Sequence, residues 1–104
     1  MFKIIKKTIR PSKDILFYFH VSPASAEFMS YLKKKYYDTN KLLSSSSKVS
    51  DDELEYVQTL VWKSHEDFLE FVVDDFCLEK FLSPQQAYEV SNNIRTEIIN
   101  EQQD

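Results

Sequence analysis

The chain has 104 residues, 42% of them apolar and 29% charged, which predicts a single globular domain over residues 1–104. It contains no glycine, which excludes the phosphate-binding loops, dinucleotide-binding turns and nucleophile elbows that require this residue. The net charge is −4, no apolar run reaches the ~20 residues of a membrane span, and the lysines near the N-terminus precede no apolar signal segment, so we expect a cytoplasmic protein.

The first part of the chain predicts two strands. Residues 14–21 are rich in aromatic and β-branched side chains and form the stronger candidate. In such a strand Ile15, Phe17, Phe19 and Val21 share one face, and Leu16, Tyr18 and His20 share the other. Residues 2–9 are a weaker strand, which could pair with 14–21 across residues 10–13.

A helix and a hairpin follow. Ser22 and Pro23 are typical of a helix start, and apolar side chains recur every four residues until about residue 38. The segments 41–50 and 54–63 predict a β-hairpin joined by the polar residues 50–53. Its second arm is apolar on both faces.

The C-terminal half predicts two more helices and a final element. Ser64 begins a capping-box pattern, with Glu66, Glu70 and Asp74 expected on a solvated face, and Ser83-Pro84 opens a helix to about Ser91. Residues 94–100 fit either a strand or a helix, and the preceding Asn92-Asn93 pair favours a turn and a strand. The lone Cys77 lies in an apolar run, where we expect a buried structural thiol.

This order predicts an α+β fold of the ferredoxin-like type, an antiparallel sheet with helices packed on one face. The segments 15–21 and 54–62 are apolar on both faces, whereas a sheet with one wet face alternates apolar and polar residues. Something must therefore cover the second face. A twofold partner could do so, sheet against sheet, or the C-terminal helix could fold underneath.

One short motif carries a family resemblance. Trp62, Ser64, Phe68 and Phe71 resemble the strand-to-helix junction of the dimeric α+β barrel superfamily, which includes the antibiotic-biosynthesis monooxygenase-like proteins. The resemblance implies a homodimer whose two sheets form a barrel, with a pocket between each sheet and its helices. Some members oxidise aromatic substrates without a cofactor, and others degrade haem.

The residues that serve haem degradation in that superfamily are missing here. Those members pair the Trp with an Asn on the first strand and a His in the second helix, whereas residues 14–21 contain no Asn and residues 66–82 no His. We therefore expect no cofactor. The abundance of Lys, Asn, Ile, Tyr and Phe and the small size also resemble virus-encoded or accessory proteins.

Four residues are candidates for lining a pocket, although each also has an ordinary structural explanation: Tyr18, His20, Gln58 and Trp62. His20 is the best acid–base candidate because histidine titrates near neutrality. Gln58 stands among apolar neighbours on its strand face, so its amide needs partners if that face is buried. His20, His65 and Cys77 lie too far apart in sequence to form a metal-ligand motif, so we predict no metal site.

Three functional hypotheses remain open. The first is a self-associating accessory protein, a homodimer, that binds a protein or a small apolar ligand without catalysis. The second is a cofactor-independent monooxygenase-like enzyme that uses a pocket near Tyr18, His20, Gln58 and Trp62. The third is nucleic-acid binding through residues 1–48, which carry ten Lys and Arg against three acidic residues. Residues 49–104 carry three against fourteen, so attraction between the two halves is the simpler explanation.

Overall fold

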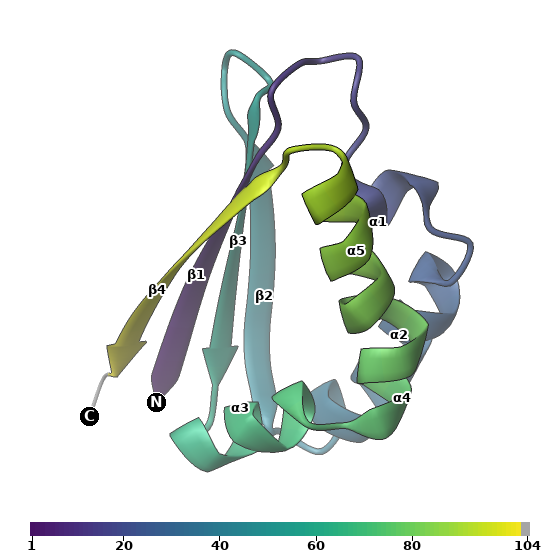
Figure 1. Ribbon diagram of the computed structural model, residues 1–104. Helices are drawn as coiled ribbons and strands as arrows, with labels where there is room; N and C mark the ends of the chain where they lie inside the picture. Colours follow the sequence, from purple (N-terminus) through teal and green to yellow (C-terminus); the bar gives the residue numbers. More distant parts are fainter. Residues whose placement is uncertain (103–104) are drawn as a thin grey trace.

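The computed structural model describes residues 1–102 and shows one antiparallel sheet with helices on one of its faces (Figure 1). The strands lie in the order β2-β3-β1-β4. Their bounds are β1 Phe2–Ile9, β2 Leu42–Val49, β3 Glu55–Trp62 and β4 Arg95–Gln102. The helical segments are α1 Tyr18–Val21, α2 Ser25–Leu32, the π-helical turn η1 Lys33–Tyr37, α3 His65–Val72, α4 Asp75–Cys77, the π-helical turn η2 Leu78–Leu82 and α5 Ser83–Ser91. This is the predicted ferredoxin-like arrangement, and residues 95–102 form the strand that the Asn92-Asn93 pair favoured.

The strand predicted at residues 14–21 is wrong. Its central place in the sheet belongs to β1, which pairs antiparallel with both β3 and β4 along its whole length. Residues 14–17 instead form a turn and a short extended piece, followed by the single helical turn α1. The aromatic side chains that suggested a strand are used differently: Phe17 is buried, and the rings of Tyr18 and Phe19 pack on Phe81. Strand propensity of aromatic residues reflects packing on a surface, and here a helical turn supplies that packing.

Two other boundaries follow local signals, but the helix start predicted at Ser22-Pro23 does not, because α2 begins at Ser25 and its N-cap Ala24 makes no side-chain cap hydrogen bond. Ser64 caps α3 by accepting a hydrogen bond from the Asp67 backbone N–H at 3.2 Å, as the capping pattern predicted. Pro84 lies in the first turn of α5. Without glycine, the tight turns use Asn40, Glu53 and Asn93 at positive φ of 61°, 61° and 57°.

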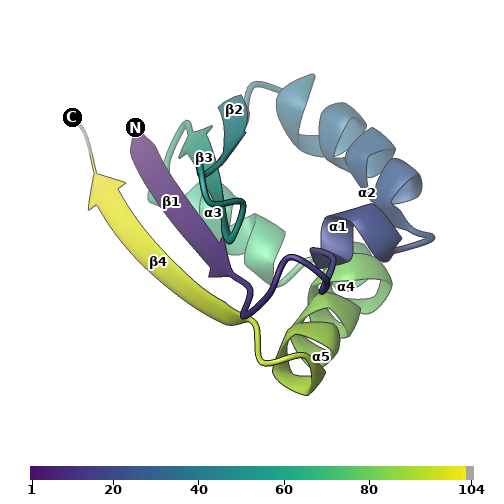
Figure 2. The ribbon, with the colours of Figure 1, turned by 90° about the horizontal axis from the view of Figure 1, so that it is seen from above.

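All the helices lie on the same side of the sheet, which Figure 2 shows from above. The helix α5 packs on that same face, so among residues 1–102 no helix folds under the sheet and the outer face stays uncovered. Cross-strand partners share a face, and the outer residues are therefore the odd-numbered ones of β1, β3 and β4. Among them are the apolar side chains Ile5, Val57, Val61 and Ile99.

The core is aromatic and lies at the C-terminal end of β3, where α2, η1 and α3 meet the sheet. Trp62 and Tyr36 are fully buried, and the Trp62 ring lies 5.2 Å from Phe71 and 5.7 Å from Tyr36 between ring centroids. Phe28 stacks on Phe81 at 4.3 Å. Cys77 is also fully buried in this cluster, as its apolar run predicted.

Of the carboxylates expected on one solvated face, Glu66 is exposed on α3, but Asp74 is not part of that face, because α3 ends at Val72 and Asp74 caps the next helix. Asp74 is buried and accepts hydrogen bonds from Tyr36 Oη at 2.6 Å, Lys35 Nζ at 2.7 Å and Tyr31 Oη at 2.8 Å. Glu70 pairs with Lys41 at 2.8 Å. Both ion pairs join the basic half of the chain to the acidic half, as the charge distribution suggested.

Candidate functional site

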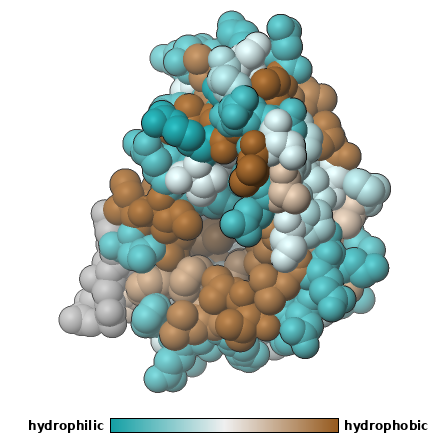
Figure 3. All heavy atoms as spheres, viewed as in Figure 1, coloured by the Kyte–Doolittle hydropathy of each residue, from teal (hydrophilic) through white to brown (hydrophobic). Residues whose placement is uncertain are grey.

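A cavity of about 880 Å³ lies between the inner face of the sheet and the helices. In the space-filling view it is a hollow with a largely hydrophobic rim, open to solvent near the middle of the face shown (Figure 3). Its size lies within the range of small-molecule sites, about 300–1,000 Å³. The aromatic and polar side chains therefore leave room for a ligand instead of filling the space.

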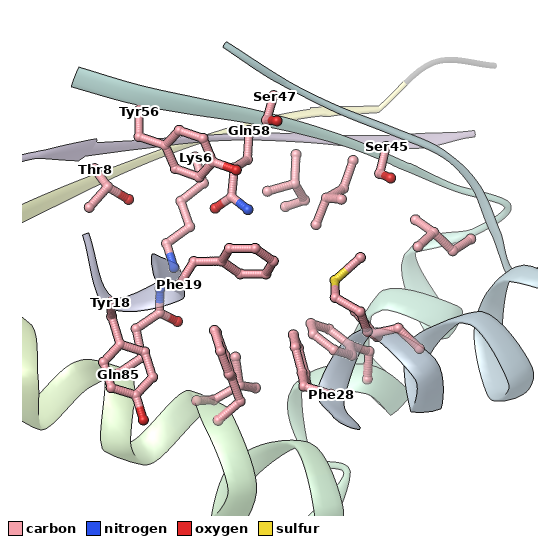
Figure 4. A pocket seen from close by; sticks show the side chains of 18 of the residues that line it. Lys6, Thr8, Tyr18, Phe19, Phe28, Ser45, Ser47, Tyr56, Gln58 and Gln85 are labelled. Atoms are coloured by element: carbon pink, nitrogen blue, oxygen red, sulfur yellow. The ribbon is translucent and has the colours of Figure 1, made fainter. Parts of the chain in front are cut away.

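The floor and walls of the cavity are mainly apolar. Even-numbered residues of β1 and β3 face it because side chains alternate along a strand, and Ile4 and Leu60 are its apolar contributions from the sheet. On the opposite side Phe28 of α2 closes it and Phe19 of α1 extends into it (Figure 4). Phe81 of η2, which stacks on Phe28, also lines it. Rings dominate these walls, which suits a flat apolar ligand.

Lys6 is the cationic group of β1 that enters this apolar space. Its neighbours on the same strand face are Ile4 and Thr8, both buried. In Figure 4 its side chain extends from the sheet towards the helical side of the cavity, where Gln85 lies. Burial lowers the pKa of its ammonium, and the charge of Glu89 opposes that shift. Among the described residues, its Nζ has no hydrogen-bond or ion-pair partner.

Glu89 of α5 also lines the cavity and is more than nine-tenths buried. One carboxylate oxygen, Oε1, accepts a hydrogen bond from the Thr96 hydroxyl at 3.2 Å. The other, Oε2, is buried and has no hydrogen-bond partner in the described part of the chain. Burial raises the pKa of this carboxyl group, and Lys6, Thr96 and Gln85 partly offset the rise. A buried polar atom without a partner is costly, and because this oxygen is on a residue that lines the cavity, it is a candidate to accept a hydrogen bond from a bound group.

The four sequence-predicted residues divide into two pairs. Tyr18 and Gln58 line the cavity, and in Figure 4 the Gln58 amide points into it from the sheet. Trp62 does not line it, because its ring is fully buried in the aromatic core. His20 does not line it either: it is exposed, and its ring lies 6.1 Å from Phe19 and 6.3 Å from Tyr56 between centroids. The predicted pocket depended on a strand at residues 14–21, and the observed cavity is instead lined by residues of β1.

Sequence reasoning missed Lys6 and Glu89, two charged residues that line the cavity. A signal for Lys6 exists: Phe2, Ile4, Lys6 and Thr8 alternate as one strand face, and a lysine among apolar residues on a buried face is unusual. No such signal marks Glu89, because an acidic residue in a helix is usually exposed and its burial here depends on how α5 packs on the sheet.

No group of three or more His, Cys, Asp and Glu side chains within residues 1–102 is placed to hold a metal ion. In the same part of the chain, every helix is too short or too polar to cross a membrane.

Comparisons with known proteins give matches in structure but not in sequence. No protein-family model and no curated protein matches the sequence. A candidate antibiotic biosynthesis monooxygenase from Deinococcus radiodurans superposes with a TM-score of 0.61 at 9% identity, over 98% of this chain and 92% of that one. SnoaB from Streptomyces nogalater, a cofactor-independent oxygenase, gives 0.58 at 14% identity, over 99% and 92%.

A dimeric ferredoxin-like protein from an uncultured marine organism gives a TM-score of 0.60 at 10% identity, over 96% of this chain and 92% of that one. At such identities the likeness establishes the fold. The chain has the ferredoxin-like α+β fold of the antibiotic-biosynthesis monooxygenase-like proteins, to which Trp62, Ser64, Phe68 and Phe71 pointed.

Proposed function

We propose that this protein is a small accessory protein that binds an apolar, ring-bearing small molecule in the cavity between the sheet and the helices. The observation that carries the proposal is an open, mainly apolar cavity of about 880 Å³ with a few polar groups facing into it. A purely structural protein would fill this space with its abundant Phe and Tyr side chains. Walls that include Phe19, Phe28 and Phe81 suit a flat aromatic molecule.

The test is a titration with fused aromatic probes, naphthalene and anthracene derivatives of graded size, followed by calorimetry. We expect saturable binding of one probe per chain with a negative heat-capacity change, because apolar surface is buried. Two adjacent serines of β2 provide a matched pair of variants. Ser45 lines the cavity, whereas Ser44 pairs with Val61 and faces outward.

Ser45→Trp therefore places an indole ring in the cavity, and Ser44→Trp places the same ring on the other face. We expect the first variant to weaken binding about tenfold, the loss of roughly 1.4 kcal/mol, and the second to bind as the natural chain does. Equal affinities for the two variants, or no saturable binding by any probe, would contradict the proposed cavity site.

A second candidate is oxidation of the bound molecule by dioxygen without a cofactor. It is favoured by the placement of Lys6 and Glu89, which could remove a proton from a bound phenol and leave an electron-rich anion. The fold neighbour SnoaB is a cofactor-independent oxygenase, which supports the same candidate. The titrations repeated in an oxygen electrode with 1-naphthol distinguish binding alone from oxidation, since only the latter consumes oxygen in proportion to protein.

We also propose that the outer sheet face binds a second copy of the chain. The apolar side chains of that face, among them Ile5, Val61 and Ile99, are covered by no helix within residues 1–102. Two of the proteins with a similar fold are dimeric ferredoxin-like proteins. Nucleic-acid binding is the weaker alternative, because lysines of the basic half are engaged by Glu53, Asp74 and Glu70.

A further inference from the structure

We propose that Lys6 is a nucleophile that captures the carbonyl group of an apolar aldehyde or ketone in the cavity as an imine, with Glu89 as its proton donor and acceptor. This inference rests on the proposed cavity site and names the chemical class of its ligand. It requires no metal and no redox cofactor. Two independent features of the structure carry it, the placement of the amine and the unpartnered carboxylate oxygen.

The first feature is the environment of the Lys6 amine. It lies in a cavity with walls of Phe, Leu and Ile, and among the described residues its Nζ makes neither a hydrogen bond nor an ion pair. A solvated ammonium is no nucleophile, whereas a lysine in an apolar pocket is readily deprotonated and reacts with carbonyl groups. Lysines that are tied to carboxylates elsewhere, such as Lys35 with Asp74, are unsuited to this chemistry.

The second feature is Glu89. Its Oε2 is buried on the cavity wall without a partner, while Oε1 is held by Thr96. The interaction between Glu89 and Lys6 affects the pKa of both groups, so the carboxyl group lies within electrostatic reach of the amine. Oε2 is therefore free to give a proton to, or take one from, a ligand atom beside Lys6. Such a proton carrier is what imine formation needs.

The reaction balances without an oxidant or a reductant. The Lys6 ammonium first gives a proton to Glu89, and the neutral amine then adds to the carbonyl carbon, so that a C–N bond forms and the π bond of the carbonyl breaks. Glu89 gives its proton to the former carbonyl oxygen and takes one from the new ammonium nitrogen, which gives a carbinolamine. Glu89 then protonates the hydroxyl group, water leaves, and the protonated C=N bond remains. The net change is one carbonyl compound and one ammonium to one iminium and one water.

The other titratable groups that share the cavity wall are Tyr18 of α1, Tyr56 of β3, and Lys33 and Tyr37 of η1. Lys33 is exposed and pairs with Asp38 at 3.1 Å, so its amine lies on the solvent side of the cavity wall. Lys33 is therefore an internal comparison for Lys6, because its residue lines the same cavity but its amine is exposed and paired.

The experiment uses the whole chain at pH 7 with 2-naphthaldehyde and cyanoborohydride, which reduces an imine to a stable amine. Peptide mapping by tandem mass spectrometry then locates the label. We expect Lys6 to be labelled about tenfold faster than Lys33 or the exposed Lys48, since a larger fraction of its amine is neutral. An excess of 2-methylnaphthalene, which has no carbonyl group, should slow labelling of Lys6 alone.

Substitutions distinguish the role of Lys6 from that of Glu89. Lys6→Met should abolish the fast phase, Lys48→Met should leave it unchanged, and Glu89→Gln should slow it about a hundredfold while calorimetric binding of 2-methylnaphthalene persists. Labelling of the natural chain that is spread evenly over its lysines overturns the imine proposal and needs no variant to fold. If 2-methylnaphthalene nevertheless binds, the cavity site stands and only the imine is wrong; if it does not bind, the proposed function fails as well.

Discussion

Asp74 shows how one carboxylate organises the contact between α2, η1 and α4. Burial by itself raises its pKa, but hydrogen bonds from Lys35, Tyr36 and Tyr31 outweigh that effect and hold the pKa well below its usual range. It also accepts the backbone N–H of Cys77 at 3.2 Å. Burial and the nearby carboxylate raise the pKa of the Cys77 thiol to about 12, so this cysteine is inert as a nucleophile.

We predict that Asp74→Asn destabilises the fold by about 2 kcal/mol, because a neutral amide leaves the donors that surround it poorly matched. Since the folded pKa of Asp74 is lowered, its contribution is present above its unfolded pKa of about 4 and is lost as the pH falls towards the folded value. Urea unfolding between pH 7 and pH 3 measures both effects. The neighbouring, exposed Asp75→Asn should change stability by about 0.5 kcal/mol or less. A loss on acidification as large in Asp74→Asn as in the natural chain would contradict this role.

At the scale of elements, the segment from residue 10 to residue 17 is held by Arg10 instead of by a strand ladder. Its Nε donates to the Glu53 carbonyl at 2.8 Å and its Nη1 to the Ile15 carbonyl at 3.0 Å. Its guanidinium also lies 4.5 Å from the centre of the Phe17 ring. One side chain thus fixes the loop on which α1 and its cavity residues depend.

We predict that Arg10→Ala loosens residues 10–17 without unfolding the sheet, at a cost of about 1–2 kcal/mol. Amide hydrogen exchange should speed up in that segment and stay slow in β1 and β3. Lys13→Ala, which removes only an exposed ion pair with Glu53, is the matched control and should have a smaller effect. Exchange that accelerates equally across the sheet would mean that Arg10 supports the whole fold and not this loop.

At the scale of the molecule, the one-sided placement of the helices bears on self-association. We predict a solution mass of twice the 12.4 kDa chain, measured by light scattering across a size-exclusion peak at several concentrations. Ile99 lies on the outer face and is half exposed in the single chain, so Ile99→Glu should give the monomer mass while leaving the helical circular dichroism unchanged. Val90, 73% exposed on α5, provides the control Val90→Glu, which should stay dimeric. A natural chain that stays monomeric at every concentration would contradict this prediction.

The sequence by itself determined most of the elements. The β-hairpin, the Ser64 cap, the Pro84 helix start and the final strand follow from local patterns of polarity and turn residues, which act within a few positions of the chain. The missing glycine ruled out whole classes of site for the same local reason. Gln58 was a candidate because a polar group among apolar ones is visible in sequence, whereas Tyr18 was a candidate only through the strand predicted at residues 14–21, which does not form.

Only the tertiary structure decided which N-terminal segment enters the sheet and which charges enter the cavity. Residues 2–9 and 14–21 both have strand composition, and the choice depends on pairing with β3 and β4, far away in sequence. Burial of Glu89 and Asp74 likewise depends on where α5 and α4 pack. A residue's environment in such cases is set by long-range contacts, which no local pattern of side chains encodes.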